Sequence, residues 1–392
     1  MIDVERYRKD TPGCQTKIHF NNAGASLLPT PVLSAMRDYL TLESVTGGYE
    51  AADLTSSAVA GFYDAMGRLL NCSSTNIAFT SSATNSYARA LSCIPFEKGD
   101  YILIAQEDYI SNQLAFLSMQ KRWGLQLLRA ASLPEGGVDV DDMKRLMDKH
   151  HPRLVSLSHI PTNSGLIQPA EEVGKLCHER DILFLLDACQ SAGQFPLDVT
   201  RLHCDFLTST FRKFLRGPRG AGFLFVSDKV LKKNLWPLFI DMRGADWVEK
   251  DTYKLRSDAK RFEDWEISCE LLLGSKAAVE YALTIGLPEI KDRNEILCHS
   301  IREKLNQLHL TTLDIGKHLS SIITVKIPGM EPGTVLGYLR EKNINSSIAT
   351  RSSAIIDFDA KGVSWALRIS PHYYNTESEV NLLIEALRKM LQ

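Results

Sequence analysis

Seven short apolar runs between residues 76 and 226 constrain the fold of this chain more than any other feature of its sequence. Most are four to seven residues long and rich in Leu, Ile, Val and Phe, and helical segments such as EEVGKLCHERD separate many of them. Apolar runs of this length that alternate with helices are typical of a parallel β-sheet covered on both faces. We therefore predict an α/β fold with strands at NIAFT (76–80), DYILIA (100–105), LQLLRA (125–130), RLVSLSHI (153–160), ILFLLDA (182–188), FLTST (206–210) and GFLFV (222–226).

The pattern changes after about residue 290, where two strand-like runs, SSIITVKI and VSWALRIS, alternate with amphipathic helical segments. This pattern predicts a smaller α+β domain, and a chain of 392 residues is too long for one ordinary core. The predicted parts are an N-terminal arm (1–20) that packs with the small domain, a large domain (21–285) and a small C-terminal domain (286–392).

Composition excludes several classes of function. The 45 basic and 47 acidic residues give a net charge of −2, so no basic excess points to nucleic acid. No apolar stretch reaches the ~18 residues of a membrane span, and the polar start MIDVERYRKD is no signal peptide. The eight cysteines lie far apart without a CxxC pair, which argues against a zinc site and favours a reducing, cytoplasmic compartment. We expect no metal, no membrane and no nucleic-acid partner.

Two charged residues at the ends of predicted strands carry most of the chemical information. Asp187 ends the strand in ILFLLDACQSAG, where a buried carboxylate needs a cation such as a protonated pyridine nitrogen; otherwise it caps a helix. Lys213 lies in the loop FRKFLRGPRGA, where Arg212, Arg216 and Arg219 are cations that favour its neutral amine and offer phosphate contacts. The alternative for this loop is a basic surface loop.

Weaker signals follow three other strands. FTSSATNSYARAL places Ser-Ala-Thr at 82–84 between a strand and a helix, where backbone N–H groups bind phosphate or a hydroxyl simply caps the helix. Tyr109 follows the next strand and could stack on a planar cofactor. His159 and Asn163 follow another strand, and a single Tyr or His there is more often a packed structural residue.

Together these groups form a recognisable series. A phosphate turn, an aromatic residue, an Asn, Asp-x-x-Gln and then a Lys 26 residues after the Asp resemble the class V aminotransferase family of pyridoxal 5′-phosphate (PLP) enzymes. That family includes cysteine desulfurases, kynureninase, epimerase-like proteins and C–S lyases. The resemblance runs from FNNAGASLLPTP to LRISPHYYNTESEV. It implies PLP-dependent fold type I, with a mainly parallel seven-stranded sheet in the large domain.

The resemblance also implies a role for individual residues. Lys213 matches the lysine that binds PLP covalently and moves the substrate Cα proton, and Asp187 matches the partner of the pyridinium nitrogen. Gln190 and Asn163 match the residues that bond the ring hydroxyl, and Tyr109 matches the residue that stacks on the ring. The implied cofactor-binding residues are Ser82, Ala83, Thr84, Tyr109, Asn163, Asp187, Gln190, Thr210, Arg212 and Lys213, and the implied substrate-binding residues are Arg368, which clamps the carboxylate, and Asn22.

The chain departs from the cysteine desulfurase pattern in two places. Arg212 stands before the lysine where desulfurases have His, and FRKFLRGPRG and RFEDWEIS resemble ergothioneine-pathway C–S lyases and isopenicillin-N-epimerase-like proteins. Loop 346–358, which carries the nucleophilic cysteine in desulfurases, contains no cysteine. The resemblance further implies a homodimer in which Trp265 and Ser268 reach the partner's site.

We therefore predict a PLP-dependent lyase that cleaves a C–S bond of a small amino acid or its sulfur conjugate by β-elimination. RFEDWEIS and the Arg351 loop are expected to shape the substrate pocket. The alternatives are an aminotransferase, epimerase or decarboxylase that uses the same site, because fold and cofactor do not choose among them. A non-catalytic or nucleotide-binding protein is a further alternative, although neither GxGxxG after the first strand nor GxxxxGK[ST] occurs.

Overall fold

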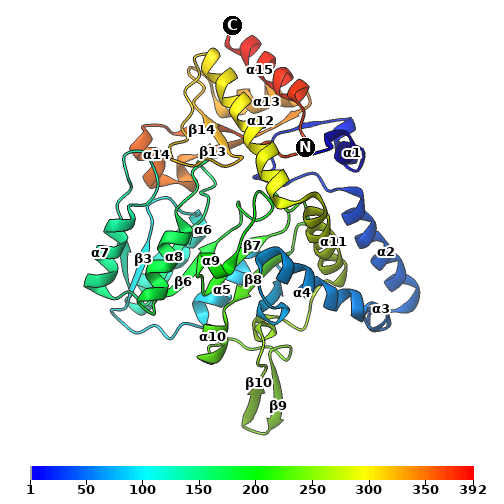
Figure 1. Cartoon of the computed structure of the whole chain (residues 1–392), viewed down its shortest axis with the longest axis vertical. Coiled ribbons are helices and arrows are strands. Elements are labelled where there is room, and N and C mark those ends of the chain that lie inside the picture. The colour runs from blue at the N-terminus through cyan, green and yellow to red at the C-terminus, as the bar shows by residue number, and fades with distance from the viewer. Residues whose placement is uncertain (1) are drawn as a thin grey trace.

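The computed structural model describes residues 2–392, and its centre is a single β-sheet (Figure 1). Within these residues the sheet has seven strands in the order β2-β8-β7-β6-β5-β3-β4, and only β8 runs antiparallel to its neighbours. All seven predicted runs form strands, so the mainly parallel sheet is confirmed. The strands are β2 (Ile77–Thr80), β3 (Tyr101–Ile104), β4 (Gln126–Arg129), β5 (Leu154–Ser158), β6 (Leu183–Asp187), β7 (Phe206–Thr210) and β8 (Gly222–Val226).

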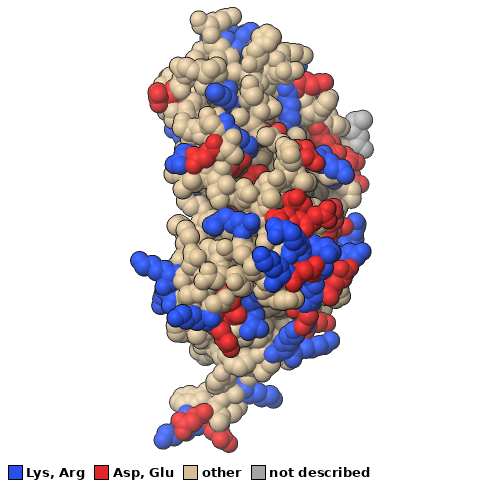
Figure 2. Space-filling view, turned by 90° about the vertical axis from the view of Figure 1, so that its left-hand side faces the viewer, with Lys and Arg blue, Asp and Glu red and all other residues tan. Residues whose placement is uncertain are grey.

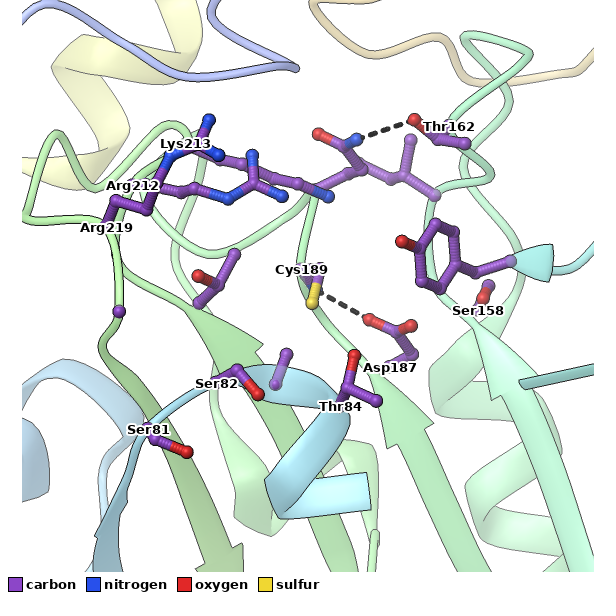
Figure 3. Close-up of a pocket in the computed structure, with 16 residues that line it drawn as sticks. Ser81, Ser82, Thr84, Ser158, Thr162, Asp187, Cys189, Arg212, Lys213 and Arg219 are labelled. Atoms are coloured by element: carbon purple, nitrogen blue, oxygen red, sulfur yellow. Dashed lines mark hydrogen bonds between the residues drawn. The ribbon is translucent and has the colours of Figure 1, made fainter. Parts of the chain in front are cut away.

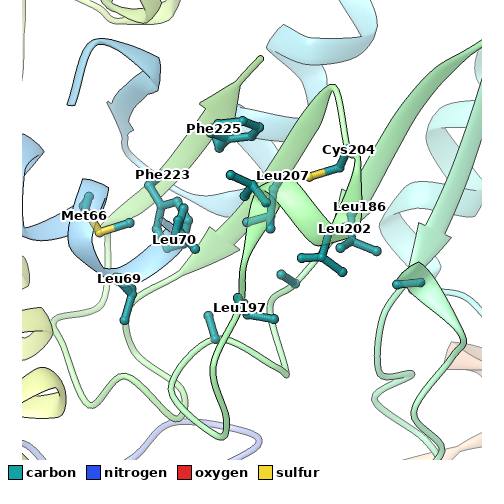
Figure 4. Close-up of a cluster of buried hydrophobic side chains, with 14 of the residues drawn as sticks. Met66, Leu69, Leu70, Leu186, Leu197, Leu202, Cys204, Leu207, Phe223 and Phe225 are labelled. Atoms are coloured by element: carbon teal, nitrogen blue, oxygen red, sulfur yellow. The ribbon is translucent and has the colours of Figure 1, made fainter. Parts of the chain in front are cut away.

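Alternating strand residues enter two separate hydrophobic cores, one on each face of the sheet. Leu186 and Leu207 belong to one cluster and pack with residues of α4, as Figure 4 shows, whereas Leu185 and Phe206 belong to the other. Side chains of successive strand residues point to opposite faces, so a sheet with two buried faces needs unbroken apolar runs. This is why the strands were visible in the sequence as short continuous runs.

Helices that precede, separate and follow the strands in the sequence cover these two faces. Several begin at side-chain caps that the sequence supplies: Ser82, Asp139 and Ser268 each accept a hydrogen bond from a backbone N–H of the first turn. No helix among residues 2–392 is both long and apolar enough to cross a membrane. The helices are α2 (Thr30–Thr46), α3 (Gly48–Leu54), α4 (Ser56–Leu70), α5 (Ala83–Ser92), α6 (Ile110–Trp123), α7 (Val140–His150), α8 (Ala170–Glu179), α9 (Val199–Leu202), α10 (Asp228–Lys232) and α11 (Cys269–Ile285).

The C-terminal part has its own sheet and its own hydrophobic cluster. An antiparallel sheet with the order β11-β14-β13 packs with the flanking helices, and the cluster runs from Leu297 to Leu387 in the sequence. Phe20, from the N-terminal segment, joins this cluster. The elements are α12 (Leu287–Gln307), β11 (Ile323–Val325), α13 (Pro332–Glu341), β12 (Ile344–Asn345), β13 (Ser347–Thr350), α14 (Ile355–Lys361), β14 (Trp365–Ile369) and α15 (Glu377–Leu391).

The N-terminal segment lies beside the C-terminal part. Strand β1 (Ile18–His19) pairs in parallel with β12, and helix α1 (Val4–Lys9) carries Arg8, whose guanidinium is 2.8 Å from the Glu379 carboxylate. Helix α1 and the start of α15 are therefore neighbours, in the upper part of Figure 1. The limits of the three predicted parts stay a prediction.

A hairpin that the sequence reading did not anticipate projects from the bottom of the molecule (Figure 1). Strands β9 (Ala245–Glu249) and β10 (Thr252–Leu255) form it, and Trp247 at its surface is 80% exposed. Figure 2 shows the same projection from the side, with acidic and basic side chains intermixed over the body above it. Strands this exposed carry no continuous apolar run, so the pattern that revealed the central sheet was absent here.

Candidate active site

A pocket of about 170 Å³ lies where the carboxyl ends of β2, β3, β5, β6 and β7 meet. Ligands bind at this edge in open α/β sheets, because the loops that follow neighbouring parallel strands converge there. In Figure 3, Arg212, Lys213 and Arg219 lie on one side of the pocket, across from Asp187 and the Ser81–Thr84 turn. The predicted residues that line it are Ser82, Ala83, Thr84, Tyr109, Asp187, Gln190, Thr210, Arg212 and Lys213.

The turn at 82–84 combines capping with an open helix N-terminus. The Ser82 hydroxyl accepts a hydrogen bond from the Asn85 N–H at 3.1 Å and so caps α5. Gly222, the first residue of β8, packs against this turn so closely that a Cβ atom would lie 2.5 Å from the Ser82 carbonyl carbon. The capping interpretation is therefore correct for the Ser82 side chain, and it leaves the first backbone N–H groups of α5 beside the pocket, where they favour an anion.

Asp187 is a buried carboxylate held by neutral hydrogen-bond donors. Its Oδ2 accepts from the Asn112 side chain at 3.0 Å, and its Oδ1 accepts from the Cys189 N–H at 2.9 Å. Residues 188–194 form turns, so Asp187 does not cap a helix. Within residues 2–392 no Lys, Arg or His forms an ion pair with it. A buried carboxylate without a cationic partner is costly, and a positively charged ligand group would offset that cost.

A second buried carboxylate, Asp108, supports the first and was missed in the sequence. Asn112 donates to Asp108 Oδ1 at 3.0 Å as well as to Asp187, and the Ser158 hydroxyl donates to the same oxygen at 2.6 Å. Burial raises the pKa of Asp108 to about 6, although these hydrogen bonds oppose the shift. Asp108 directly precedes Tyr109, so its place at a predicted strand end was the signal that could have found it.

Lys213 has the environment that a reactive amine requires. Its side chain is buried, and burial lowers its pKa; Cys189 and Asp187 oppose the shift, while Arg212 and Arg368 add to it. A lowered pKa makes the neutral, nucleophilic amine more accessible. The Lys213 Nζ atom lies 5.9 Å from the centre of the Tyr109 ring, so the amine and the predicted stacking residue share the pocket. The loop is not a basic surface loop.

Arg216 does not face the pocket, contrary to the prediction that it is a cation beside Lys213. Its fully buried guanidinium points away, 4.3 Å from the Tyr374 ring centre, and donates to the Tyr373 hydroxyl at 2.5 Å. It also donates to the Thr11 hydroxyl at 2.6 Å. Arg216 thus ties the lysine loop to the N-terminal segment and to the residues after β14. Arg219, three residues later, does line the pocket.

Arg368 lies at the margin of the pocket. The part-buried Arg368 donates to the Thr162 hydroxyl at 2.6 Å and to the Ser347 hydroxyl at 3.0 Å, and Thr162 lines the pocket. Burial and the nearby Arg212 lower the Arg368 pKa to about 10. No carboxylate among the described residues pairs with Arg368, so its charge is available to an anionic group.

Asn163 and Asn22 are not brought to the pocket. The Asn163 amide donates to Asp357 Oδ2 at 2.6 Å and lines a neighbouring pocket. Asn22 is fully buried, donates to the Ser370 carbonyl at 2.8 Å and accepts from the Tyr374 hydroxyl, also within hydrogen-bond distance. Neither position in the sequence revealed which way the side chain turns.

Gln190 lies at the pocket as predicted, and only the nitrogen of its side-chain amide forms hydrogen bonds. Its Nε2 donates to the Thr162 hydroxyl at 3.0 Å, whereas its buried Oε1 has no hydrogen-bond partner in the described part of the chain. Trp265 is 47% exposed, and the Ser268 hydroxyl caps α11; neither lines the pocket of its own chain. Their contribution to a partner's site stays a prediction.

Cysteine is nearly absent from the surroundings of the amine. Loop 346–358 forms β13, a short turn and the start of α14, and it contains no cysteine. Cys189 is the one cysteine among the described residues that line the pocket. Burial raises the pKa of its thiol, and the neighbouring Asp187 raises it further, which disfavours the nucleophilic thiolate.

The fold and this pocket define a class of protein: an α/β enzyme that places a buried lysine, a buried carboxylate and a helix N-terminus around one ligand site. The sequence model of the family described as Aminotransferase class-V matches residues 18–383. The chain therefore belongs to the class V aminotransferase family and is a PLP-dependent enzyme.

Similar proteins are named for sulfur chemistry. A probable cysteine desulfurase of Pyrococcus abyssi is 28% identical over 397 residues, which cover 99% of this chain and 98% of the relative. The apo structure of cysteine desulfurase from Thermococcus onnurineus NA1 superposes with a TM-score of 0.91 at 25% identity, covering 100% of this chain and 98% of the other. The cystine C–S lyase C-DES, solved with cysteine persulfide, has a TM-score of 0.86 at 22% identity, covering 96% and 99%. A C-DES variant carries glycine linked covalently to PLP.

Proposed function

We propose that this enzyme cleaves the C–S bond of cysteine or of a cysteine conjugate by β-elimination. One observation carries the proposal: the pocket places the buried amine of Lys213 near Asp187, and its described lining residues include no cysteine with a lowered thiol pKa. Burial raises the pKa of the part-buried Cys189 thiol, and loop 346–358 has no cysteine. Transfer of sulfur to an enzyme thiolate needs such a nucleophile, whereas elimination needs a base at Cα.

The charges and hydrogen-bonding groups of the pocket residues fit the groups of PLP. Asp187 is a buried carboxylate without an ion-pair partner among residues 2–392, which suits a protonated ring nitrogen. The N-terminus of α5 suits the phosphate, and Gln190 offers an amide oxygen without a partner to a hydroxyl group. Tyr109 suits one ring face. Asn163 would join this set only after leaving Asp357.

When bound, PLP withdraws electrons from the bonds at the substrate Cα. Lys213 then performs the proton chemistry: its neutral amine accepts the Cα proton, which is possible because burial lowers its pKa. Arg368, which donates to the Thr162 hydroxyl, is the proposed clamp for the substrate carboxylate. Loss of the β-substituent as a thiol, followed by addition of water, gives pyruvate and ammonia.

The relatives support sulfur chemistry and leave the finer assignment to this proposal. Cysteine desulfurases and C-DES act on cysteine-type compounds by their names. We assign the chain to the C–S lyase side of this group, toward the ergothioneine-pathway and epimerase-like subgroup, because Arg212 precedes the lysine and FRKFLRGPRG follows that subgroup's pattern. The relatives do not favour transamination, epimerisation or decarboxylation.

We further propose a homodimer in which Trp265 and Ser268 contact the partner's site, in the cytoplasm. A Trp side chain that is 47% exposed beside the capped start of α11 is a suitable contact for a second copy. All eight cysteines are free, which accords with a reducing compartment.

The test is a product analysis of the purified holoenzyme with L-cysteine and with S-substituted cysteines. We expect equal amounts of pyruvate, ammonia and the corresponding thiol or sulfide. Alanine with a protein-bound persulfide would contradict the proposal in favour of a desulfurase, and a keto acid with pyridoxamine phosphate would indicate a transaminase. Size measurement of the holoenzyme tests the dimer, which a monomeric active species contradicts.

A further inference from the structure

A second pocket, of about 280 Å³, lies next to the first. It is bounded by the start of α6 and by residues 352–357, which lead into α14. Adjacent residues divide between the two pockets: Tyr109 lines the first and Ile110 the second, and Thr162 lines the first and Asn163 the second. The two spaces are therefore separated by little more than one layer of side chains.

The wall of this second pocket is mainly apolar, although much of it meets solvent. Ile110, Ile356 and Ala354 are part-buried, and Leu114 and Ile355 are 58% and 52% exposed. Large aliphatic side chains exposed around a concave space, beside a polar site, are typical of a ligand pocket. The two elements that form it come from the large and the C-terminal parts, and pockets favour such boundaries.

Two polar atoms in this wall lack partners. The Glu107 Oε2 and the Asn163 Oδ1 atoms are shielded from solvent and make no hydrogen bond within residues 2–392. Asp357, in contrast, is fully engaged, because it accepts from Asn163 at 2.6 Å and pairs with Lys361 at 2.6 Å. Buried polar atoms without partners are costly, so these two atoms could accept a hydrogen bond from a ligand group, separately from the apolar part of the wall.

The volumes indicate why the reaction needs this space. At about 170 Å³, the first pocket is smaller than the ~300 Å³ at which pockets for drug-sized ligands begin, so PLP leaves little room in it for a large substrate substituent. The proposed carboxylate clamp, Arg368, donates to Thr162, and Asn163 is the next residue along the same loop. A substituent on the substrate sulfur therefore has the second pocket within reach.

We propose that the second pocket binds the sulfur substituent of an S-substituted cysteine, of an aliphatic or aryl kind, and so sets the substrate class. This inference rests on the proposed C–S lyase function. It makes Ile110, Leu114 and Ala354 specificity-determining residues, and it identifies S-substituted cysteines, more than free cysteine, as the substrates that use the whole site.

The test compares S-benzyl-L-cysteine with S-methyl-L-cysteine as substrates of the holoenzyme. Ala354→Trp and, as a second variant, Leu114→Trp fill the pocket. Arg122→Trp is the matched control, because Arg122 is exposed on the same helix, further from the pocket-lining Leu114 and Leu117, and does not line the pocket. We expect both filling variants to lower the ratio of the two kcat/KM values (benzyl over methyl) by ~10-fold or more, the size of effect that apolar pocket contacts produce. The control leaves the ratio unchanged.

Binding gives a readout that does not depend on turnover. Calorimetry with PLP-loaded Lys213→Ala protein should show S-benzyl-L-cysteine binding that Ala354→Trp weakens and Arg122→Trp does not. If the wild type cleaves both substrates but the filling variants leave the ratio unchanged, the pocket assignment is wrong and the lyase function stands. If the wild type cleaves neither, the lyase function itself fails. A filling variant that changes the oligomeric state and not the ratio would assign this surface to a second copy instead.

Discussion

The Asn112 side-chain nitrogen lies 3.0 Å from Asp187 Oδ2, and so joins helix α6 to the end of strand β6. The same nitrogen is 3.0 Å from Asp108 Oδ1. The Asn112 amide therefore lies between two buried carboxylates and donates a hydrogen bond to each of them. Hydrogen bonds from the Asn112 side chain and the Cys189 N–H to its two oxygens fix the orientation of the Asp187 carboxylate at the pocket.

Replacing this amide should loosen both carboxylates. We expect Asn112→Ala to lower the free energy of unfolding of the apo protein by about 1–3 kcal/mol, the cost of leaving the buried Asp187 Oδ2 atom without a donor. Urea unfolding measures the change. Ser118→Ala, an exposed position on the same helix, should change it by less than about 0.5 kcal/mol. Equal effects of the two substitutions would show that the bridge contributes nothing.

Lys213 is expected to be indispensable for catalysis. Lys213→Ala removes the proposed base at Cα, and such a group accounts for ~10²–10⁴-fold of the rate. The substitution should also abolish the visible absorbance of lysine-bound PLP. Lys175→Ala, on the exposed side of α8, is the control and should retain both activity and spectrum. A Lys213→Ala protein with the wild-type spectrum would refute the assignment.

Asp108 should make the stability of the apo protein depend on pH in an unusual direction. Burial raises its pKa to about 6, above the value in the unfolded chain. The folded state therefore binds more protons between about pH 4 and 6, and the free energy of unfolding falls as the pH rises through this window, by on the order of 3 kcal/mol. Asp108→Asn should remove this component, which unfolding curves at pH 4, 5, 6 and 7 would detect. Parallel pH profiles for the wild type and the variant would contradict it.

Two arginines of one loop should differ in their effect on stability. Arg216 is fully buried among tyrosines, so Arg216→Ala leaves a cavity and removes the hydrogen bonds to the Thr11 and Tyr373 hydroxyls, at a cost of about 2–5 kcal/mol. Arg219 is exposed, and Arg219→Ala should cost less than about 0.5 kcal/mol. Thermal or urea unfolding compares the two, and similar losses would show that Arg216 is not a structural tie.

The sequence predicted what depends on the path of the backbone. Asp187 and Lys213 end or follow apolar runs, and parallel strands bring such positions to one edge whatever the details of packing. The same reasoning could not give side-chain directions. The Asn163 side chain donates to Asp357, which lies 194 residues later. The Arg216 guanidinium points away from Lys213, because it packs on three tyrosine rings and donates to Thr11.

The residues that were missed have a common physical cause. Asn112 acts through hydrogen bonds to Asp108 and to Asp187 at the end of β6, and no local sequence pattern reveals the second of these partners. The β9–β10 hairpin is exposed on both faces, so it lacks the apolar run by which a buried strand is found. Side-chain contacts between residues far apart in the sequence, more than errors in local secondary structure, therefore limited the prediction of the site.

The close contact of Gly222 with the Ser82 turn has a consequence for the size of ligand that this enzyme can hold. Gly222 begins β8, directly after the loop that carries Lys213, and its missing side chain lets the strand touch the turn at the N-terminus of α5. The same glycine thus sets the separation between the amine and the anion-binding turn. The backbone fixes this separation, so it limits the distance between the two groups of a ligand that contact the amine and the turn.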